Sequence, residues 1–245
     1  MNAAVDESLT AALVAALLAG LGGLLVPRLV ARVPEPAQTA SDVPDDEPPK
    51  TAYAVIAARP GLGLRSALAS AVAGGLLGAA TGLGWPLLWL VPLVPVAVAL
   101  SVIDWHTRLL PRVIVVPATL AAILVVGVVG LATDQREALV RALVAMVVAR
   151  SFFWVLWFVR SAGMGFGDVR LAAPVGLVLG WAGWGELAVG LWAGFLLFAV
   201  PALAVIVARR DRSLLKRSFP FGPFMVGGAL VGLVWGTAIA GRVWG

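Results

Sequence analysis

Residues 163–171 read Gly-Met-Gly-Phe-Gly-Asp-Val-Arg-Leu, and the rest of the chain can be interpreted outward from this stretch. Three glycines, Gly163, Gly165 and Gly167, occupy alternate positions and lead directly into Asp168. An apolar run follows, which predicts a helix that begins beside the aspartate. Very few of the 13 acidic residues lie against such a run, so Asp168 is a candidate for a function that needs a carboxylate at an apolar span.

The composition is that of a membrane protein. Of the 245 residues, 61% are hydrophobic and only 13% are charged, about half the charge of a typical soluble domain. Long apolar runs recur along the chain, which predicts an all-α polytopic membrane protein. The absence of cysteine excludes disulfides and thiolate metal sites, and the single histidine, His106, argues against a histidine-based metal cluster.

We expect about eight transmembrane helices with the N-terminus outside. The first covers residues 9–30, with an acidic flank before it and a basic flank after it, which is the reverse of a signal peptide. The polar region that follows is rich in Pro, Asp and Glu and is predicted to be a flexible cytoplasmic linker. Seven more spans are predicted at residues 64–83, 86–103, 112–131, 138–160, 169–184, 186–208 and 223–243. The predicted domains are therefore a first helix, a linker and a seven-helix core, at residues 1–32, 33–63 and 64–245.

Lysines and arginines set the expected orientation. This topology places 14 of the 18 on the cytoplasmic side and three, Arg136, Arg141 and Arg242, on the outer side, as the positive-inside rule requires. The net charge of +5 is explained in this way, and nucleic acid is not an expected partner. Arg150 falls inside a span, where it could reach the interface, bind a backbone carbonyl or face Asp104 and Asp168.

The candidate site follows by elimination, because few residues can carry chemistry. The chain has no cysteine nucleophile, no Gly-x-Ser-x-Gly elbow and no phosphate-binding loop. All but two of the acidic residues lie in the tail, the linker or polar loops. Asp104, which ends the third span, and Asp168, which starts the sixth, remain, and the topology places both at the cytoplasmic side. A structural role is also open for each, Asp168 as a helix cap and Asp104 as the ion-pair partner of Arg108.

Four short motifs resemble those of the prepilin peptidases, the A24-type membrane aspartic proteases with a Gly-x-Gly-x-Gly-Asp motif. That motif corresponds to residues 163–168, and Arg170 follows where the family more often has Lys. Residues 103–111 (Ile-Asp-Trp-His-Thr-Arg-Leu-Leu-Pro) resemble the family's first aspartate motif. Residues 220–224 (Pro-Phe-Gly-Pro-Phe) resemble the motif before its last helix, and residues 32–34 (Arg-Val-Pro) resemble an Arg-Leu-Pro motif after its first helix.

The resemblance implies an aspartic endopeptidase of the bacterial plasma membrane, with Asp104 and Asp168 as its catalytic residues. Its substrates would be type IV prepilins or pseudopilins, whose basic leader ends in Gly ahead of an apolar helix. The lipid bilayer would surround the enzyme. A role in positioning the substrate or the loop is expected for Gly163, Gly165, Gly167, Arg108 and Arg170.

One region departs from the family. Many bacterial members have paired Cys-x-x-Cys motifs in the loop after the first helix, and they also methylate the new N-terminus with S-adenosylmethionine. The corresponding residues here, 33–60, are few and include no cysteine. We therefore expect no zinc site and no cofactor for cleavage, with S-adenosylmethionine needed only if a methyltransferase activity persists.

A mechanism follows from two neighbouring carboxylates that share one proton. The ionised member can take a proton from water while the protonated member polarises the scissile carbonyl. Asp168 is predicted near a helix N-terminus and Asp104 near a helix C-terminus, and each dipole effect is worth roughly 0.3–1 kcal/mol. We therefore expect Asp168 to be the base and Asp104 the acid. The alternating glycines would leave room for an extended substrate backbone.

Two other interpretations remain open. A transporter would use the aspartates as a paired ion site, but it predicts inverted repeats and broken helices, and the sequence shows no convincing repeat. A protease of the signal-peptide-peptidase or presenilin kind would resemble Tyr-Asp and Pro-Ala-Leu patterns. This chain has Ile103-Asp104 and the motif at residues 220–224 instead.

Overall fold

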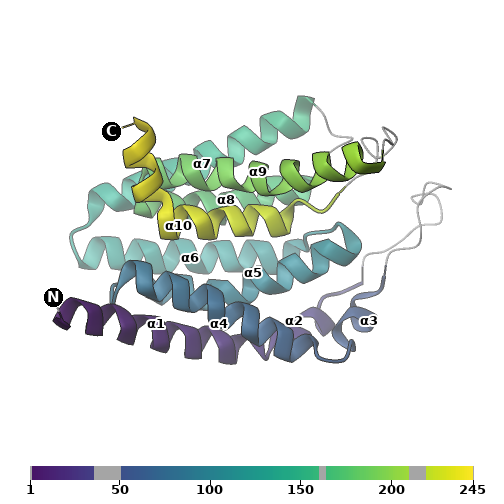
Figure 1. Ribbon diagram of the computed structural model, residues 1–245, viewed down its shortest axis with the longest axis horizontal. Coiled ribbons are helices and arrows are strands. Elements are labelled where there is room, and N and C mark those ends of the chain that lie inside the picture. Colours follow the sequence, from purple (N-terminus) through teal and green to yellow (C-terminus); the bar gives the residue numbers. More distant parts are fainter. Residues whose placement is uncertain (1, 36–50, 160–163, 210–218, 245) are drawn as a thin grey trace.

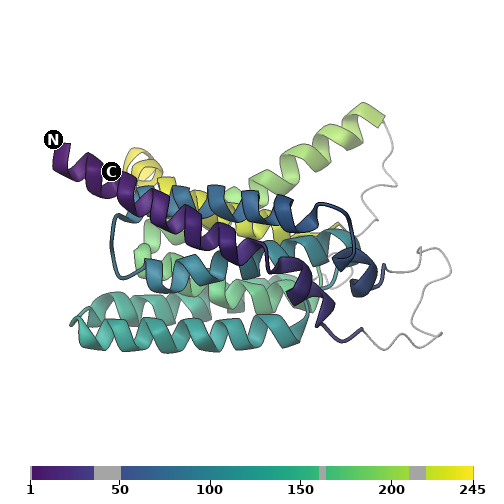
Figure 2. The ribbon, with the colours of Figure 1, turned by 90° about the horizontal axis from the view of Figure 1, so that it is seen from below.

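The computed structural model describes residues 2–35, 51–159, 164–209 and 219–244. Within these residues α-helices are the regular secondary structure, as predicted, and there is no strand. The helices are α1 (Asn2–Gly23), α2 (Val26–Ala31), α3 (Tyr53–Ala57), α4 (Leu62–Thr81), α5 (Leu87–Thr107), α6 (Arg112–Ala132), α7 (Arg136–Val159), α8 (Phe166–Ala182), α9 (Trp184–Arg209) and α10 (Gly222–Trp244). The long helices run roughly along one axis, and the two chain termini lie at the same end of the bundle (Figures 1 and 2).

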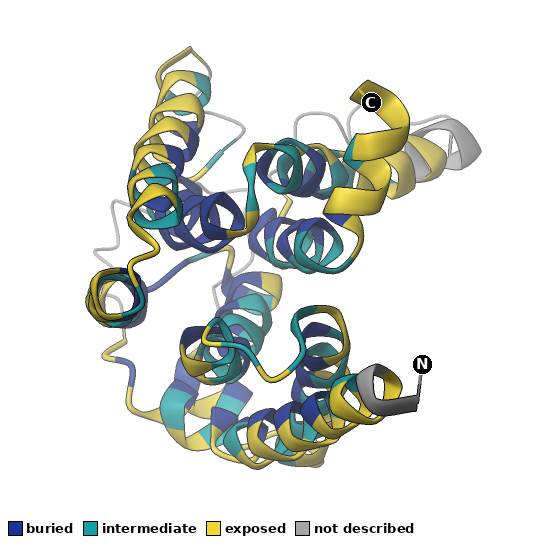
Figure 3. Ribbon diagram, turned by 90° about the vertical axis from the view of Figure 1, so that its left-hand side faces the viewer, coloured by how far each residue is buried: buried dark blue, intermediate teal, exposed yellow. Residues whose placement is uncertain are grey.

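Each of the eight predicted spans corresponds to helical structure. Among the described residues, seven segments are long and apolar enough to cross a membrane, and the first of them joins α1 and α2. The remaining predicted span, the sixth, is α8, which has 17 residues and is shorter than the others. Large apolar side chains such as Leu124, Phe158 and Trp192 are exposed, and exposed positions cover the outside of the bundle (Figure 3). This surface fits a protein surrounded by lipid, and the chain is an all-α polytopic membrane protein.

Small residues allow three pairs of helices, α1 with α4, α7 with α8, and α9 with α10, to pack most closely. A Cβ atom placed on Gly74 of α4 would lie 2.6 Å from the carbonyl oxygen of Ala15 in α1. A Cβ on Gly176 of α8 would lie 2.7 Å from the carbonyl oxygen of Ala145 in α7. Helices in lipid associate through such close backbone contact, because burial of apolar surface gives little driving force there.

Helix α8 is buried along most of its length. Residues 171–181 are all buried. A helix that is short for a lipid bilayer is therefore surrounded by other helices along most of its length. Its C-terminal carbonyls need partners that water does not supply. Arg141 of α7 provides them, since Nε donates to the carbonyl of Gly180 at 2.8 Å and a terminal nitrogen donates to that of Trp181 at 2.7 Å. The positive charge also suits the negative end of the helix dipole.

The close packing of α1 against α4 gives a test of the fold. Gly74→Ala should lower the melting temperature in detergent, because the new methyl group overlaps α1 at a cost of about 1–3 kcal/mol. Gly127→Ala in α6 is the matched control, since nothing lies within 4 Å of the Cβ that it would introduce. Both substitutions change the intrinsic helix propensity equally, so the difference between their melting temperatures measures the effect of the contact between α4 and α1. Equal melting temperatures would show that α1 and α4 do not pack in this way.

Candidate active site

Asp104 lies in the last turn of α5 and is buried, with 4% of its surface exposed. The helix ends at Arg108, which adopts a left-handed conformation (φ 54°) and donates its backbone N–H to the carbonyl of Asp104 at 2.8 Å. The neighbouring Ile103 is fully buried and anchors this turn in the apolar core. The end of α5 therefore holds a carboxylate inside the protein at the point where the helix stops.

Asp168 lies in the first turn of α8 and is 6% exposed. Gly165 is the N-cap residue, in an extended conformation, and its carbonyl accepts the backbone N–H of Asp168 at 3.1 Å. The backbone of Gly165 also lies beside the Asp168 carboxylate and interacts with it. Asp168 is thus a residue of the first turn that reaches back toward the cap, as acidic residues at this position often do.

The structure brings the two predicted aspartates together. Their side chains come from α5 and α8, and they are close enough for the charges to interact. Ionisable groups buried in this way are costly unless they are paired or hydrogen-bonded. Among the described residues, no group of three or more His, Cys, Asp or Glu side chains gathers as a metal-ligand cluster. The arrangement is therefore a carboxylate pair within the described part of the chain.

Gly222 is a third member of the site, and the sequence interpretation assigned it no role. Its backbone N–H, at the start of α10, donates to Oδ2 of Asp104 at 2.9 Å. This bond and the N-terminal end of the α10 dipole both favour the anion at Asp104. The prediction that Asp168 is the ionised member counted only the helices that carry the aspartates. With α10 included, each aspartate lies near a helix N-terminus, so the helix dipoles no longer favour the anion at Asp168 alone. The motif at residues 220–224, which contains Gly222, was the sequence signal from which this role could have been inferred.

Glycines let three backbone segments meet around Leu110, which is buried just after α5. A Cβ on Gly167 would lie 2.8 Å from Cβ of Leu110, and a Cβ on Gly222 would lie 2.8 Å from Oδ2 of Asp104. Any larger residue at either position would push the segments apart. Gly165 is exposed, while Gly163 lies outside the described residues.

The predicted arginines have different surroundings. Arg108 is exposed at the end of α5. Arg170 is half-buried, and its guanidinium carbon lies 4.8 Å from the centroid of the Phe166 ring, a cation–π contact within α8. A role for either in positioning stays a prediction. Arg150 is exposed on α7, and its role stays a prediction.

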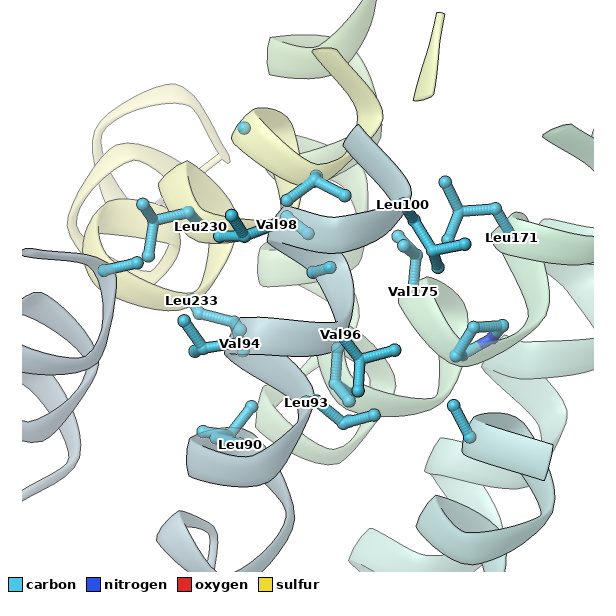
Figure 4. A pocket seen from close by; sticks show the side chains of 18 of the residues that line it. Leu90, Leu93, Val94, Val96, Val98, Leu100, Leu171, Val175, Leu230 and Leu233 are labelled. Atoms are coloured by element: carbon cyan, nitrogen blue, oxygen red, sulfur yellow. The ribbon is translucent and has the colours of Figure 1, made fainter. Parts of the chain in front are cut away.

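An apolar cavity of about 150 Å³ lies beside the site, between α5 and the helices α4, α6, α8 and α10. Its lining includes Leu100, one turn before Asp104, and Leu171, one turn after Asp168. Val226, one turn after Gly222, lines it too. Figure 4 shows apolar side chains from these helices facing the space around α5. The polar site therefore stands next to space that suits an apolar group.

Comparison with known proteins shows which family and which relatives this chain is similar to. The sequence model of the type IV leader peptidase family matches residues 91–236. The prepilin leader peptidase/N-methyltransferase of Aeromonas salmonicida is 30% identical over 157 residues, which are 64% of this chain and 52% of that protein. The protein of the same name from Pseudomonas aeruginosa is 32% identical over 142 residues, 58% of this chain and 47% of that protein. The chain thus spans about half the length of the curated relatives it matches, and no solved structure matches it significantly.

The resemblance seen in the sequence motifs is confirmed by these matches. The matched region covers more than half of the chain and includes Asp104, Asp168 and Gly222. This chain belongs to the type IV leader peptidase family.

Proposed function

We propose that this chain is a membrane aspartic endopeptidase that removes the leader peptide of type IV prepilin-like proteins. The observation that carries the proposal is the pair of buried carboxylates, Asp104 and Asp168, that α5 and α8 bring together beside the N-terminus of α10. Membership of the type IV leader peptidase family and the names of the relatives support the same substrate class. Prepilins or pseudopilins are therefore the proposed partners, in the bacterial plasma membrane.

In the proposed reaction the pair holds one proton, because two adjacent buried carboxylates are not both ionised. The Gly222 N–H stabilises the anion of Asp104, so Asp104 takes a proton from water as the water oxygen attacks the scissile carbonyl carbon. Asp168 gives its proton to the carbonyl oxygen. Collapse of the tetrahedral gem-diol intermediate breaks the C–N bond: one hydroxyl returns its proton to Asp168 as the carbonyl re-forms, and the proton held by Asp104 passes to the leaving nitrogen. The two groups titrate as one unit, so these roles describe the dominant protonation state.

The apolar cavity supports this choice of substrate. Prepilin leaders precede an apolar helix, so the residues after the scissile bond need apolar surroundings next to the carboxylates. The cavity lined by Leu100, Leu171 and Val226 offers such surroundings one turn from each member of the site. We propose that apolar side chains next to the cleavage point enter this space.

The proposal covers cleavage alone. The relatives' names include an N-methyltransferase activity, and the matched part of this chain contains the carboxylate pair. Carboxylates and water account for hydrolysis, so no cofactor enters the proposed reaction. S-adenosylmethionine would be required only for methylation.

The carboxylate pair is tested by substitution in a purified preparation with a prepilin leader substrate. Asp104→Asn and Asp168→Asn should each reduce kcat by about 10²–10⁴-fold, because each removes one acid–base group. Asp134→Asn is the control, since Asp134 is 86% exposed in a loop and asparagine tolerates its positive φ of 55°. Normal cleavage by either Asp104→Asn or Asp168→Asn would rule out the aspartic mechanism.

The hydrogen bond from Gly222 is tested by adding a single methyl group. Gly222→Ala would place a Cβ 2.8 Å from Oδ2 of Asp104, and the displaced carboxylate should lower kcat by about 100-fold with little change in KM. Gly241→Ala in the same helix is the control, because its Cβ would meet nothing within 4 Å. If the Gly222 and Gly241 variants have equal kcat values, the position of Asp104 does not depend on Gly222.

A further inference from the structure

Phe221, the residue immediately before α10, is 7% exposed and packs against three other phenylalanine rings. The ring centroids of Phe195, Phe198 and Phe153 lie 5.2, 5.5 and 5.8 Å from the centroid of Phe221. All three distances are those of favourable aromatic pairs. Phe153 belongs to α7, and Phe195 and Phe198 lie one turn apart on α9. These three rings form a phenylalanine cage around the side chain of Phe221.

The phenylalanine cage is itself held in the core. The rings of Phe153 and Phe195 stack on each other, with centroids 5.7 Å apart and an angle of 7° between their planes. Phe153 is 1% exposed and belongs, with Phe221, to the core cluster against which Phe195 and Phe198 pack. The cage therefore joins the start of α10 to α7 and α9, two helices that carry neither aspartate of the pair.

The backbone of Phe221 completes the first turn of α10. Its carbonyl accepts the N–H groups of Phe224 at 3.1 Å and of Met225 at 3.0 Å, and Pro223 has no N–H group. Among residues 222–225, the N–H of Gly222 is therefore the one that the turn leaves free for another partner. That N–H donates to Oδ2 of Asp104 at 2.9 Å.

A single peptide unit connects the phenylalanine cage to the carboxylate. The carbonyl of Phe221 and the N–H of Gly222 belong to the same peptide bond, which is planar, and in its trans form the two groups point in opposite directions. The carbonyl points into the first turn of α10, so the N–H must point out of it, toward Asp104. The position of the Phe221 side chain thus determines where this N–H lies.

We propose that Phe221 is a positioning residue for Asp104, and that the phenylalanine cage acts through the peptide bond between Phe221 and Gly222. A smaller side chain at position 221 would leave the carboxylate in place but let the start of α10 move. Because a hydrogen bond weakens steeply as its donor turns away from the acceptor, the anion of Asp104 would lose part of its stabilisation. The role in cleavage rests on the proposed function, whereas the packing of Phe221 in the cage does not.

The test uses Phe221→Leu, which keeps an apolar side chain but removes the ring. This variant should lower kcat by about tenfold with KM unchanged, the size expected when one hydrogen bond to a charged group is weakened. Adding Phe221→Leu to Gly222→Ala should cause no further loss, because the donor is already displaced. Phe195→Leu removes one ring of the cage and should lower kcat in the same way, so it replaces Phe221→Leu if that variant does not fold.

Phe152→Leu is the matched control. Phe152 contacts the rings of Phe153 and Phe195 from outside the cage, and within the described part of the chain it has no ring contact with Phe221. The same substitution there should leave kcat unchanged. An equal loss of kcat in Phe152→Leu and Phe221→Leu would show a general effect of looser packing and would overturn the positioning role.

Hydrogen exchange gives a readout that does not depend on catalysis. The backbone amides of Gly222, Phe224 and Met225 should exchange faster in Phe221→Leu than in the unsubstituted chain, and Phe152→Leu should leave them unchanged. Unchanged exchange in Phe221→Leu would overturn the proposal that the cage holds this turn. Faster exchange with an unchanged kcat would overturn the positioning role, as would additive losses with Gly222→Ala. None of these results would affect the dependence of cleavage on the two aspartates, which tests the proposed function separately.

Discussion

The hydrogen bond from the Gly222 N–H to the Asp104 carboxylate is the constraint on which the candidate site depends. A carboxylate buried at the end of a membrane helix needs a hydrogen-bond donor. Helix α5 ends within one turn of Asp104 and does not supply this donor. The start of α10 supplies it. Glycine is required there because a Cβ would strike the carboxylate, and Gly167 meets Leu110 for a similar steric reason. This polar contact joins the start of α10 to the end of α5, and the contact between Gly167 and Leu110 brings the start of α8 to the same place.

Packing in lipid explains why this polar site stands beside an apolar cavity. The three closest helix pairs interlock through glycine and alanine, which bring backbones into contact without large side chains. Helix α5 belongs to none of these pairs, and the space around it is lined by Leu, Val and Ala side chains. Close packing in the pairs therefore leaves room beside the helix that carries Asp104. An apolar substrate segment would need that room, and a uniformly close-packed bundle would not provide it.

Sequence alone predicted the helices and the two aspartates, because hydropathy defines spans and few other residues could carry chemistry. It did not predict Gly222 as a donor, since that contact joins residues 118 positions apart and involves a backbone atom. It also did not predict that Tyr53 and Ile56 would be buried in the region assigned to a linker, because a five-residue helix has no periodicity to detect. The predicted assignment of base and acid left out α10 for a related reason. Helix dipoles act on any nearby carboxylate, whichever helix carries it.

The proposed function requires Asp104 and Asp168 to form one coupled acid–base unit. Infrared titration of the protonated-carboxyl band in the unsubstituted chain, Asp104→Asn and Asp168→Asn measures this coupling most directly. Coupling predicts that removing either carboxylate changes the pH at which the remaining one titrates. The titration curve of the protonated-carboxyl band in the unsubstituted chain would then differ from the sum of the curves of the two variants. If each remaining carboxyl group instead titrated as it does in the unsubstituted chain, the two aspartates would be independent and the account would be contradicted.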